Sequence, residues 1–392
     1  MGFDMAKQKK VIRTKRIYRK RSGHKRAFGA VLFVLLLVAL VGFGYIVMKE
    51  WSKRFGSGTP PSSVVSSDLT SLPSSESTSS EVSSEPSASL GAVHAKLMPA
   101  ADLTRTGTAL TEYMQSLKSA GYDAVYIELK SADGTVTFNT ANEMAKQFGA
   151  VSETPADLDA LISAAKGAGL TPIARISALQ DPKAAHVKYG NSFGYENSAE
   201  VNWLDDSPAN GGKAWLNPYM ENARKYIADL CAEASQHGFA GIVLENVTFP
   251  LKNTGKMGTL NETTTRDKIL AQLVEESQAA AGETPVYLEI TPRMVAEYGL
   301  NAVAAMSSNQ ALSLDPAQAE RYRIELTQMV SPNAAQPYTV DEVFYDILLG
   351  NVLVTSENVK RIAMMDSAVY EQSWKAMQED PLHPMTLGYI VR

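Results

Sequence analysis

Short apolar runs alternate with helical patterns along the chain from about Leu90 onward. Apolar positions three or four apart predict helices, and short runs rich in β-branched residues predict strands. Because strands and helices alternate, the pattern favours an α/β fold with a parallel sheet, and eight repeats favour a closed (β/α)8 TIM barrel. A doubly wound open sheet is the alternative. The predicted strands cover residues 91–97, 123–129, 171–177, 240–246, 285–291, 310–315, 322–329 and 360–366, and the predicted helices cover residues 107–119, 155–168, 218–236, 262–281, 340–349 and 368–378.

The segment from Trp215 to Pro250 shows this alternation most clearly. Pro218 suits the first turn of its helix, where a missing N–H costs nothing. His237-Gly238 should end that helix, because glycine accepts the left-handed conformation that closes many helices. An apolar strand follows, and Glu245 stands where that strand should end. In α/β folds the chemistry lies at the carboxyl ends of the strands, so Glu245 is a candidate catalytic residue.

Other predicted strands also carry polar side chains toward their carboxyl ends. Side chains of a strand alternate between its two faces, so residues two apart share a face. The helix-covered outer face of a barrel strand is apolar, and the polar face should therefore turn inward and upward. We expect six charged side chains to gather around one mouth of the barrel: Glu128, Lys130, Arg175, Glu245, Glu289 and Asp315.

Several carboxylates at one mouth are typical of glycoside hydrolysis, in which one carboxylic acid protonates the leaving oxygen and a carboxylate attacks the sugar or activates water. We expect Glu245 to be the nucleophile or base and Glu289 the acid. A salt-bridge layer without turnover is the alternative. The remaining candidates would bind and position substrate, and they are Glu128, Lys130, Arg175, Asp315, Trp203 and Trp215. Core packing is the alternative role of the two tryptophans.

The N-terminal part of the chain predicts a membrane anchor. Residues 1–26 form a basic tail, and residues 27–48 are uncharged and long enough to span a bilayer. A cleaved signal peptide is the alternative, but the apolar run is longer than such peptides carry. Basic residues before the span predict a cytoplasmic N-terminus. Residues 49–90 are rich in serine and proline, which is typical of a disordered linker, and residues 91–392 would form an extracellular barrel.

Charge and composition exclude several other functions. The basic residues are concentrated in the short tail and the remainder is acidic, so no nucleic-acid partner is expected. The five histidines lack metal-ligand spacing, and no glycine-rich phosphate loop follows a strand, so we expect neither a metal nor a cofactor. The single cysteine, Cys231, lies within the helix before Glu245 and is expected to be a buried hydrophobic residue.

Three segments together resemble a known family: YIELKSADGTVTF (126–138), IARISALQDPKAA (173–185) and the segment from Trp215 to Pro250. They are similar to the glycoside-hydrolase-like family that carries domain of unknown function 4015, a (β/α)8 barrel related to the α-amylase clan. The chain departs from the family pattern in having Glu245 where the family has Asp and Thr248 where it has Arg, as expected of a divergent member.

The resemblance implies a glycosidase, and together with the predicted anchor it indicates a membrane-anchored, extracytoplasmic enzyme that acts on a cell-envelope or environmental polysaccharide. The departures leave a second possibility open, a catalytically inactive glycan-binding or envelope scaffold module on the same barrel. A protein-interaction domain in envelope assembly is a third interpretation.

Overall fold

The computed structural model describes residues 93–258, 264–314, 316–330, 333, 335–337, 339, 360–365 and 389–392. The predicted basic tail, apolar span and linker lie outside these residues, as do the predicted helices 340–349 and 368–378 and the candidate Asp315. Among the helices of the described part, none is long and apolar enough to cross a membrane.

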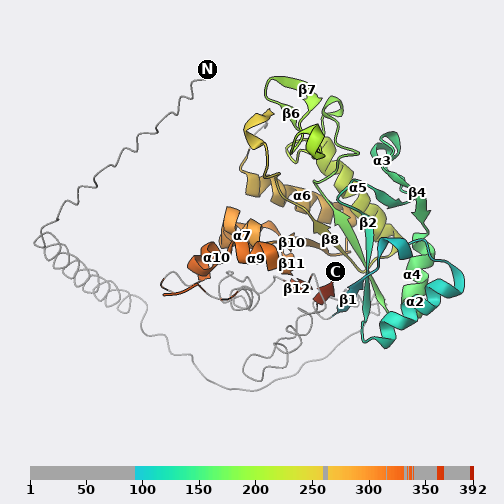
Figure 1. Ribbon diagram of the computed structural model, residues 1–392. Helices are drawn as coiled ribbons and strands as arrows, with labels where there is room; N and C mark the ends of the chain where they lie inside the picture. Colours follow the sequence, from blue (N-terminus) through green and yellow to red (C-terminus); the bar gives the residue numbers. More distant parts are fainter. Residues whose placement is uncertain are drawn as a thin grey trace, which may run out of the picture. The chain divides into compact units, whose positions relative to one another are not determined.

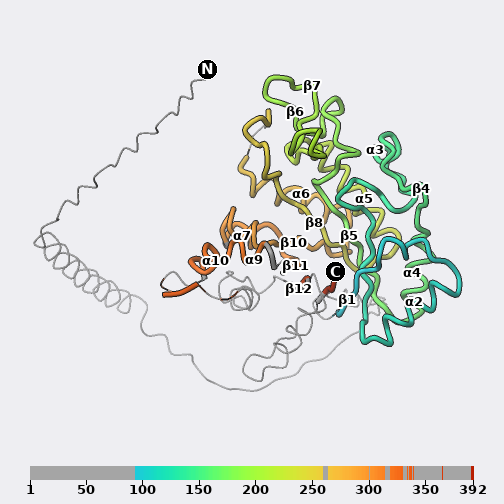
Figure 2. The backbone as a smooth tube through the Cα atoms, in the orientation of Figure 1, coloured from blue at the N-terminus to red at the C-terminus, as the bar shows by residue number. Residues whose placement is uncertain are grey.

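In the described part of the chain, eight parallel strands pair side by side in a closed circle. Figure 1 labels β1, β2, β8, β10, β11 and β12 among them. The circle closes because β1 pairs with β2 on one side and with β13 on the other. Figure 2 shows the end of the chain, after β13, beside β1. The fold is therefore mixed α/β with a mainly parallel, TIM-like sheet, as the alternating pattern predicts. In order around the circle the strands are β1 (His94–Leu97), β2 (Ala124–Lys130), β5 (Thr171–Ser177), β8 (Gly241–Glu245), β10 (Val286–Ile290), β11 (Asn309–Leu314), β12 (Lys360–Met365) and β13 (Tyr389–Val391).

Shorter strands and helices surround this circle. β3 pairs with β2 in antiparallel orientation and carries β4, while β6 joins β7 and β9 in a separate small sheet. On the outside, α5 packs against α6, and α2 packs against α4. The additional strands are β3 (Val136–Phe138), β4 (Val151–Ala156), β6 (Gly194–Tyr195), β7 (Ser198–Asn202) and β9 (Met257–Gly258). The α-helices are α2 (Gly107–Ser119), α3 (Glu143–Gln147), α4 (Leu158–Gly167), α5 (Glu221–His237), α6 (Arg266–Ala281), α7 (Pro292–Tyr298), α8 (Leu300–Met306), α9 (Pro316–Arg321) and α10 (Arg323–Val330). Short 3-10 helices are η2 (Ala100–Asp102), η3 (Val187–Tyr189), η4 (Pro208–Asn210) and η5 (Thr254–Lys256).

Helix α5 leads into the strand that ends at Glu245, much as predicted. It ends at His237, and the following Gly238 has a φ of 87°, the left-handed conformation expected of a glycine stop. It begins at Glu221, so Pro218 precedes the helix and does not occupy its first turn. Cys231 lies buried on this helix, and burial raises the pKa of its thiol to about 12. The cysteine therefore packs as a small hydrophobic side chain.

One of the eight predicted strands is wrong. Residues 322–329 lie largely in helix α10, where Leu326 is buried and Ile324 is 56% exposed. The apolar alternation in this segment is too short to distinguish a strand from a helix. The eighth strand of the circle is β13, which has only three residues and is too short to produce an apolar pattern.

Two hydrophobic layers hold the barrel together. The larger one lies between the strands and the outer helices. The smaller one fills the inside, where nearly every strand contributes one inward side chain, and it comprises Ala95, Ala124, Tyr126, Ile173, Val243, Tyr287, Ala311, Met364 and Ile390. The inside of the barrel is thus filled by this inner layer. Residues two positions further along each strand point inward as well and form the next layer toward the carboxyl ends of the strands.

The turn between β2 and β3 depends on a glycine. Gly134 has a φ of 85°, and a Cβ at this position would lie 2.3 Å from Asp181 Oδ1. We expect Gly134→Ala to lower the free energy of unfolding by more than the ~1–2 kcal/mol that left-handed geometry alone costs. Gly121→Ala is the matched control, because Gly121 has a φ of 93° and a Cβ added there would meet nothing within 4 Å. Urea denaturation measures the free energy of unfolding of each variant. Equal losses of this free energy in the two variants would show that the contact with Asp181 is unimportant.

Candidate active site

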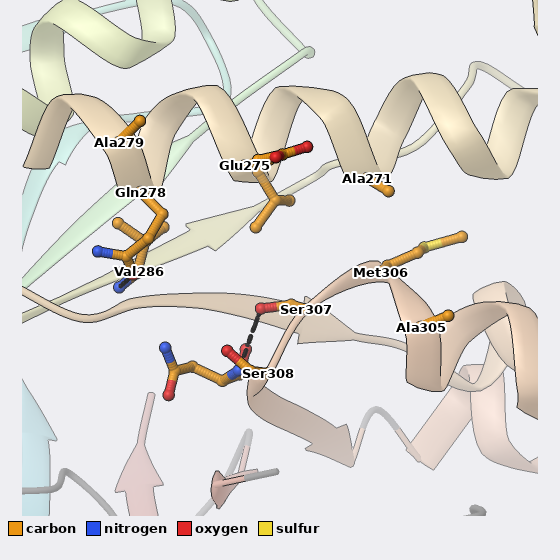
Figure 3. Close-up of a pocket in the computed structure, with 11 residues that line it drawn as sticks. Ala271, Glu275, Gln278, Ala279, Val286, Ala305, Met306, Ser307 and Ser308 are labelled. Carbon is orange, nitrogen blue, oxygen red and sulfur yellow. Dashed lines mark hydrogen bonds between the residues drawn. The ribbon is translucent and has the colours of Figure 1, made fainter. Parts of the chain in front are cut away.

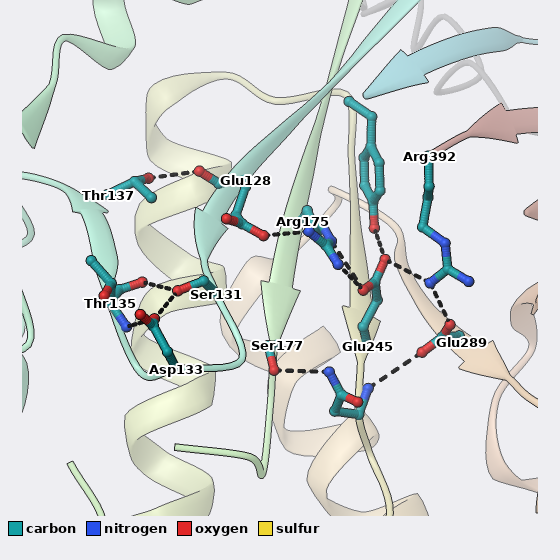
Figure 4. A network of polar contacts seen from close by, with 12 residues as sticks. Glu128, Ser131, Asp133, Thr135, Thr137, Arg175, Ser177, Glu245, Glu289 and Arg392 are labelled. Atoms are coloured by element: carbon teal, nitrogen blue, oxygen red, sulfur yellow. Dashed lines mark hydrogen bonds and ion pairs between the residues drawn. The ribbon is translucent and has the colours of Figure 1, made fainter. Parts of the chain in front are cut away.

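A polar layer lies directly above the inner apolar layer of the barrel. Each member follows an inward apolar residue by two positions, so strand alternation points it inward as well. Glu245 follows Val243 on β8, and Glu289 follows Tyr287 on β10. The charged members that contact one another are Glu128, Arg175, Glu245, Glu289 and Arg392 (Figure 4).

Glu245 lies at the centre of this layer and is only 2% exposed. Arg175 donates to Glu245 Oε2 from Nε at 2.9 Å and from Nη2 at 2.7 Å. The Tyr126 hydroxyl donates to Oε1 at 2.9 Å, and Arg392 Nη1 lies 3.4 Å from the same oxygen. Burial alone would raise the pKa of Glu245, but the charge and hydrogen bonds of Arg175, together with Arg392 and Tyr126, outweigh it and lower the pKa. Glu245 is therefore held as a carboxylate.

Glu289 has the opposite electrostatic environment. Arg392 Nη1 donates to its Oε1 at 2.8 Å, and the Asn246 N–H lies 3.4 Å from Oε2. Burial and the negative charge of Glu245 raise the pKa of Glu289 by more than Arg392 and the Asn246 hydrogen bond lower it. The two carboxyl groups are thus driven apart in pKa, one ionised and the other favouring its proton. Such a split is how glycosidases assign a base and an acid to two similar side chains.

A single nitrogen, Arg392 Nη1, contacts both carboxyl groups. Glu245 Oε1 and Glu289 Oε1 can therefore be no farther apart than the sum of its two contact distances, 3.4 Å and 2.8 Å. This upper limit is compatible with the ~5–5.5 Å spacing of retaining glycosidases and lies below the ~6.5–9.5 Å spacing of inverting ones.

Glu128 completes one side of the polar layer, and the hydroxyl of Tyr126 reaches it from the apolar layer below. Glu128 forms an ion pair with Arg175 Nη1. Burial raises the pKa of Glu128 despite the opposing charge of Arg175, and the nearby Glu245 raises it further. Burial also raises the pKa of Tyr126 well above its ordinary value, so its hydroxyl remains a neutral donor to Glu245.

The backbone turns sharply just after Glu245. Asn246 has a φ of 55°, a left-handed conformation that asparagine adopts more readily than most residues. Its side-chain Nδ2 donates to Ser177 Oγ at 3.0 Å, which ties the turn to the end of β5. This conformation also brings the Asn246 N–H to Glu289.

The structure does not bring all of the predicted site residues together. Glu128, Arg175, Glu245 and Glu289 meet as expected. Lys130 does not join them, because the pairing of β2 with β5 shifts between Glu128 and Lys130 and places Lys130 opposite Ile176. Its ammonium is fully enclosed, 3.1 Å from Asp181 Oδ2 and 2.6 Å from the Ser177 carbonyl. These contacts describe a structural ion pair.

The two candidate tryptophans occupy different environments. Trp203 is fully buried, donates to the Asn253 carbonyl at 3.2 Å and packs edge-on against Phe193. These contacts are those of a core residue. Trp215 is 8% exposed and lines a surface pocket.

Three residues that contact one another or the carboxylates of this site were absent from the sequence-based candidates. Tyr126 has a usable signal, because it stands two residues before Glu128 on the same strand. Ser313, two residues after the inner Ala311, accepts a hydrogen bond from Arg392 Nη2 at 2.7 Å. Arg392 had no signal, since the three-residue strand β13 that positions it could not be recognised.

A pocket of about 460 Å³ lies at the opposite end of the strands (Figure 3). Its walls come from α6, from the end of α8 and from the first residues of β10 and β11, Val286 and Asn309. The amino-terminal ends of barrel strands serve stability more than chemistry. The polar layer at the carboxyl ends remains the candidate active site.

Comparison with solved structures finds glycoside hydrolases among the similar chains. The glycoside hydrolase domain of PelA from Pseudomonas aeruginosa is 12% identical, with a TM-score of 0.40, and the match covers 76% of this chain and 94% of that one. An α-L-fucosidase from Paenibacillus thiaminolyticus is 15% identical, with a TM-score of 0.46, over 76% of this chain and 46% of the fucosidase. A hypothetical protein from Ruminiclostridium thermocellum is 17% identical, with a TM-score of 0.43, over 49% of this chain and 95% of that one.

No curated protein sequence matches the chain significantly. The sequence profile of the family DUF4015, described as a "putative glycosyl hydrolase domain", matches residues 98–299. The matched range begins just after β1 and ends just after α7, so it includes Glu128, Arg175, Glu245 and Glu289. The chain therefore belongs to the DUF4015 family of glycosyl hydrolase-like proteins.

Proposed function

We propose that the barrel hydrolyses O-glycosidic bonds, with Glu245 as nucleophile or base and Glu289 as general acid. The observation that carries this proposal is the opposed electrostatics of the two carboxyl groups. Arg175 and Arg392 favour ionised Glu245, while burial and the charge of Glu245 favour protonated Glu289. Both groups stand at the carboxyl ends of neighbouring strands, where barrel enzymes hold their catalytic residues.

In this mechanism Glu289 donates its proton to the leaving glycosidic oxygen. Glu245 attacks the anomeric carbon or activates water, and the spacing of the two groups favours direct attack and retention of configuration. Tyr126 and Arg175 hold the Glu245 carboxylate in place. Because Arg392 bridges both carboxyl groups, a bound sugar has to displace its guanidinium from at least one of them.

The proposed substrate is a cell-envelope or environmental polysaccharide. Family membership supports a glycan substrate, and the sequence of residues 1–48 supports an anchor with a cytoplasmic N-terminus and an extracellular barrel. Protease added to intact cells should remove the barrel and leave the basic tail protected. Protection of the barrel would contradict this orientation.

A second candidate function is glycan binding without turnover. The contacts of Glu245 favour it, because two arginines and a tyrosine already occupy both carboxylate oxygens. The two carboxyl groups are also nearly enclosed, at 2% and 6% exposure. In this case the polar layer would be a structural ion-pair network, and glycans would bind on the loops above it.

Release of reducing ends from isolated envelope polysaccharides separates the two candidates. The hydrolase proposal expects release by the wild-type protein, loss of release by Glu245→Gln, and full release by the control Glu112→Gln, which alters an exposed glutamate. Glycan binding by the wild type without any release would favour the binding module. Failure of the wild type to bind or cleave any glycan would contradict both.

A further inference from the structure

A second pocket, of about 320 Å³, opens on the loops at the same end of the barrel as the paired carboxyl groups. It is within the general size range of small-molecule sites, ~300–1,000 Å³. Gln180 comes from the loop after β5, Lys252 from the loop after β8, and Arg293 from α7, which follows β10. Those three strands carry Arg175, Glu245 and Glu289. The complete lining is Gln180, Asp205, Asp206, Asn210, Gly211, Lys213, Trp215, Leu251, Lys252 and Arg293.

The apolar part of the lining consists of Trp215 and Leu251. The Trp215 indole is fixed, because its Nε1 donates to Asp205 Oδ2 at 3.0 Å. Leu251 is 53% exposed and gives the pocket an accessible apolar surface. An indole and an aliphatic side chain together suit the C–H face of a sugar ring, while the amides of Gln180 and Asn210 suit hydroxyl groups.

The cations of the pocket have unused hydrogen-bonding capacity. Arg293 Nη2 donates to the Phe249 carbonyl at 2.7 Å and to Glu297 at 3.2 Å, which fixes the guanidinium. Its Nε is enclosed and has no hydrogen-bond partner among the residues that the structure describes. Within the described residues, the Lys213 ammonium forms no ion pair, and Lys252 lies 3.9 Å from Asp206.

The two carboxylates of the pocket are already committed to their own loop. Asp205 accepts from the Lys213 N–H at 2.7 Å as well as from Trp215. Asp206 accepts from the Ser207 N–H at 2.7 Å and from Asn210 Nδ2 at 3.1 Å, and these bonds lower its pKa. The lining carries three cationic side chains, Lys213, Lys252 and Arg293, against the two aspartates, and the aspartate oxygens are already hydrogen-bonded within their loop. The balance of charge and of free acceptors therefore favours a ligand with an anionic group over a cationic one.

We propose that this pocket is a subsite for an acidic sugar residue, such as a uronic acid, whose carboxylate binds Arg293 and Lys213. The ring packs on Trp215 and Leu251. The subsite would select glycans that carry a carboxylate near the bond to be broken. For that cleavage step the inference rests on the proposed hydrolase function. Binding at the subsite does not itself require turnover.

Titration of the wild-type protein with glucuronate, glucose and glucosamine, followed by NMR, tests the subsite directly. We expect glucuronate to bind at least about 10-fold more tightly than glucose, because its carboxylate accepts charge-assisted hydrogen bonds that glucose cannot form. Lys213→Gln should weaken glucuronate binding by about 10-fold and leave glucose binding unchanged. Lys188→Gln is the matched control, since Lys188 is exposed on η3 and does not line the pocket.

Arg293→Gln should weaken glucuronate binding as much as Lys213→Gln or more. Because Arg293 also bonds to Phe249 and Glu297, Lys213→Gln keeps the proposal testable if the Arg293 variant does not fold. Equal binding of glucuronate and glucose, or tighter binding of glucosamine, would overturn the subsite.

The outcomes for the subsite and for the hydrolase are distinguishable. Glucuronate binding that depends on Lys213, without hydrolysis of any acidic glycan, would leave the subsite standing and remove the hydrolase. Hydrolysis of neutral glycans without preferential binding of glucuronate would support the hydrolase and remove the subsite.

Discussion

Glu289→Gln is expected to lower kcat/KM for an unactivated glycan by ~10²–10⁴-fold, the usual contribution of general acid catalysis. Glutamine keeps the shape of the side chain but has no carboxyl proton to give to the leaving oxygen. An aryl glycoside with an acidic phenol as leaving group needs little protonation, so the loss should be much smaller for that substrate. Rates for the two substrate types, measured side by side, check this prediction.

The control for this substitution is Glu112→Gln, which should leave both rates unchanged because Glu112 is exposed on α2, away from the polar layer. Equal losses for the two substrate types would mean that Glu289 supports the structure of the site and does not donate the proton. Unchanged rates would remove Glu289 from the mechanism.

Arg175→Met is expected to lower the free energy of unfolding by ~3–5 kcal/mol, which is the cost of removing one partner of a buried ion pair. Methionine fills much of the volume but leaves Glu245, at 2% exposure, with Arg392 as its remaining cationic contact. Urea denaturation of the two proteins gives the difference. Lys225→Met is the control, since both partners of the ion pair of Lys225 with Asp229 are exposed, at 66% and 42%, and this pair should contribute less than ~1 kcal/mol.

Adding Glu245→Gln to Arg175→Met should recover part of that loss, because the double variant no longer buries a carboxylate without its main partner. Strictly additive losses in the four-protein cycle would show that the two side chains are not coupled. The cycle therefore tests the contact that lowers the pKa of Glu245 independently of any activity.

Much of the barrel could be predicted because its strands have one apolar and one mixed face. Strand alternation placed Glu128, Arg175, Glu245 and Glu289 on the inner side, and they do converge. Helix periodicity gave the bounds of α2, and the Gly238 stop gave the end of α5. These features depend on local patterns, which a sequence records directly.

The remaining features depend on pairing between distant segments. Lys130 leaves the polar layer because of a register shift between β2 and β5, and register is set by neighbours that the strand itself does not encode. Arg392 enters the layer because a three-residue strand pairs with both β1 and β12. A segment that short has no periodicity to detect.

Strand β13, which the sequence pattern did not predict, changes how the departures from the family pattern are interpreted. The chain has Thr248 where the family has an arginine, and that departure taken alone suggests that Glu245 lacks a cation to hold it ionised. Arg175 and Arg392 provide two such cations. Residues other than the family's arginine therefore supply the positive charge that keeps the pKa of Glu245 low.

The pH dependence of kcat/KM tests the central claim, that Glu245 and Glu289 form a catalytic base and acid pair, most directly. Glu245 must be ionised, so activity should fall as the pH drops through its pKa, which lies below the ordinary value for glutamate. Glu289 must be protonated, so activity should fall as the pH rises through its pKa, which lies above that value. We predict a bell-shaped profile whose basic limb is absent in Glu289→Gln. A basic limb that persists in that variant would contradict the assignment.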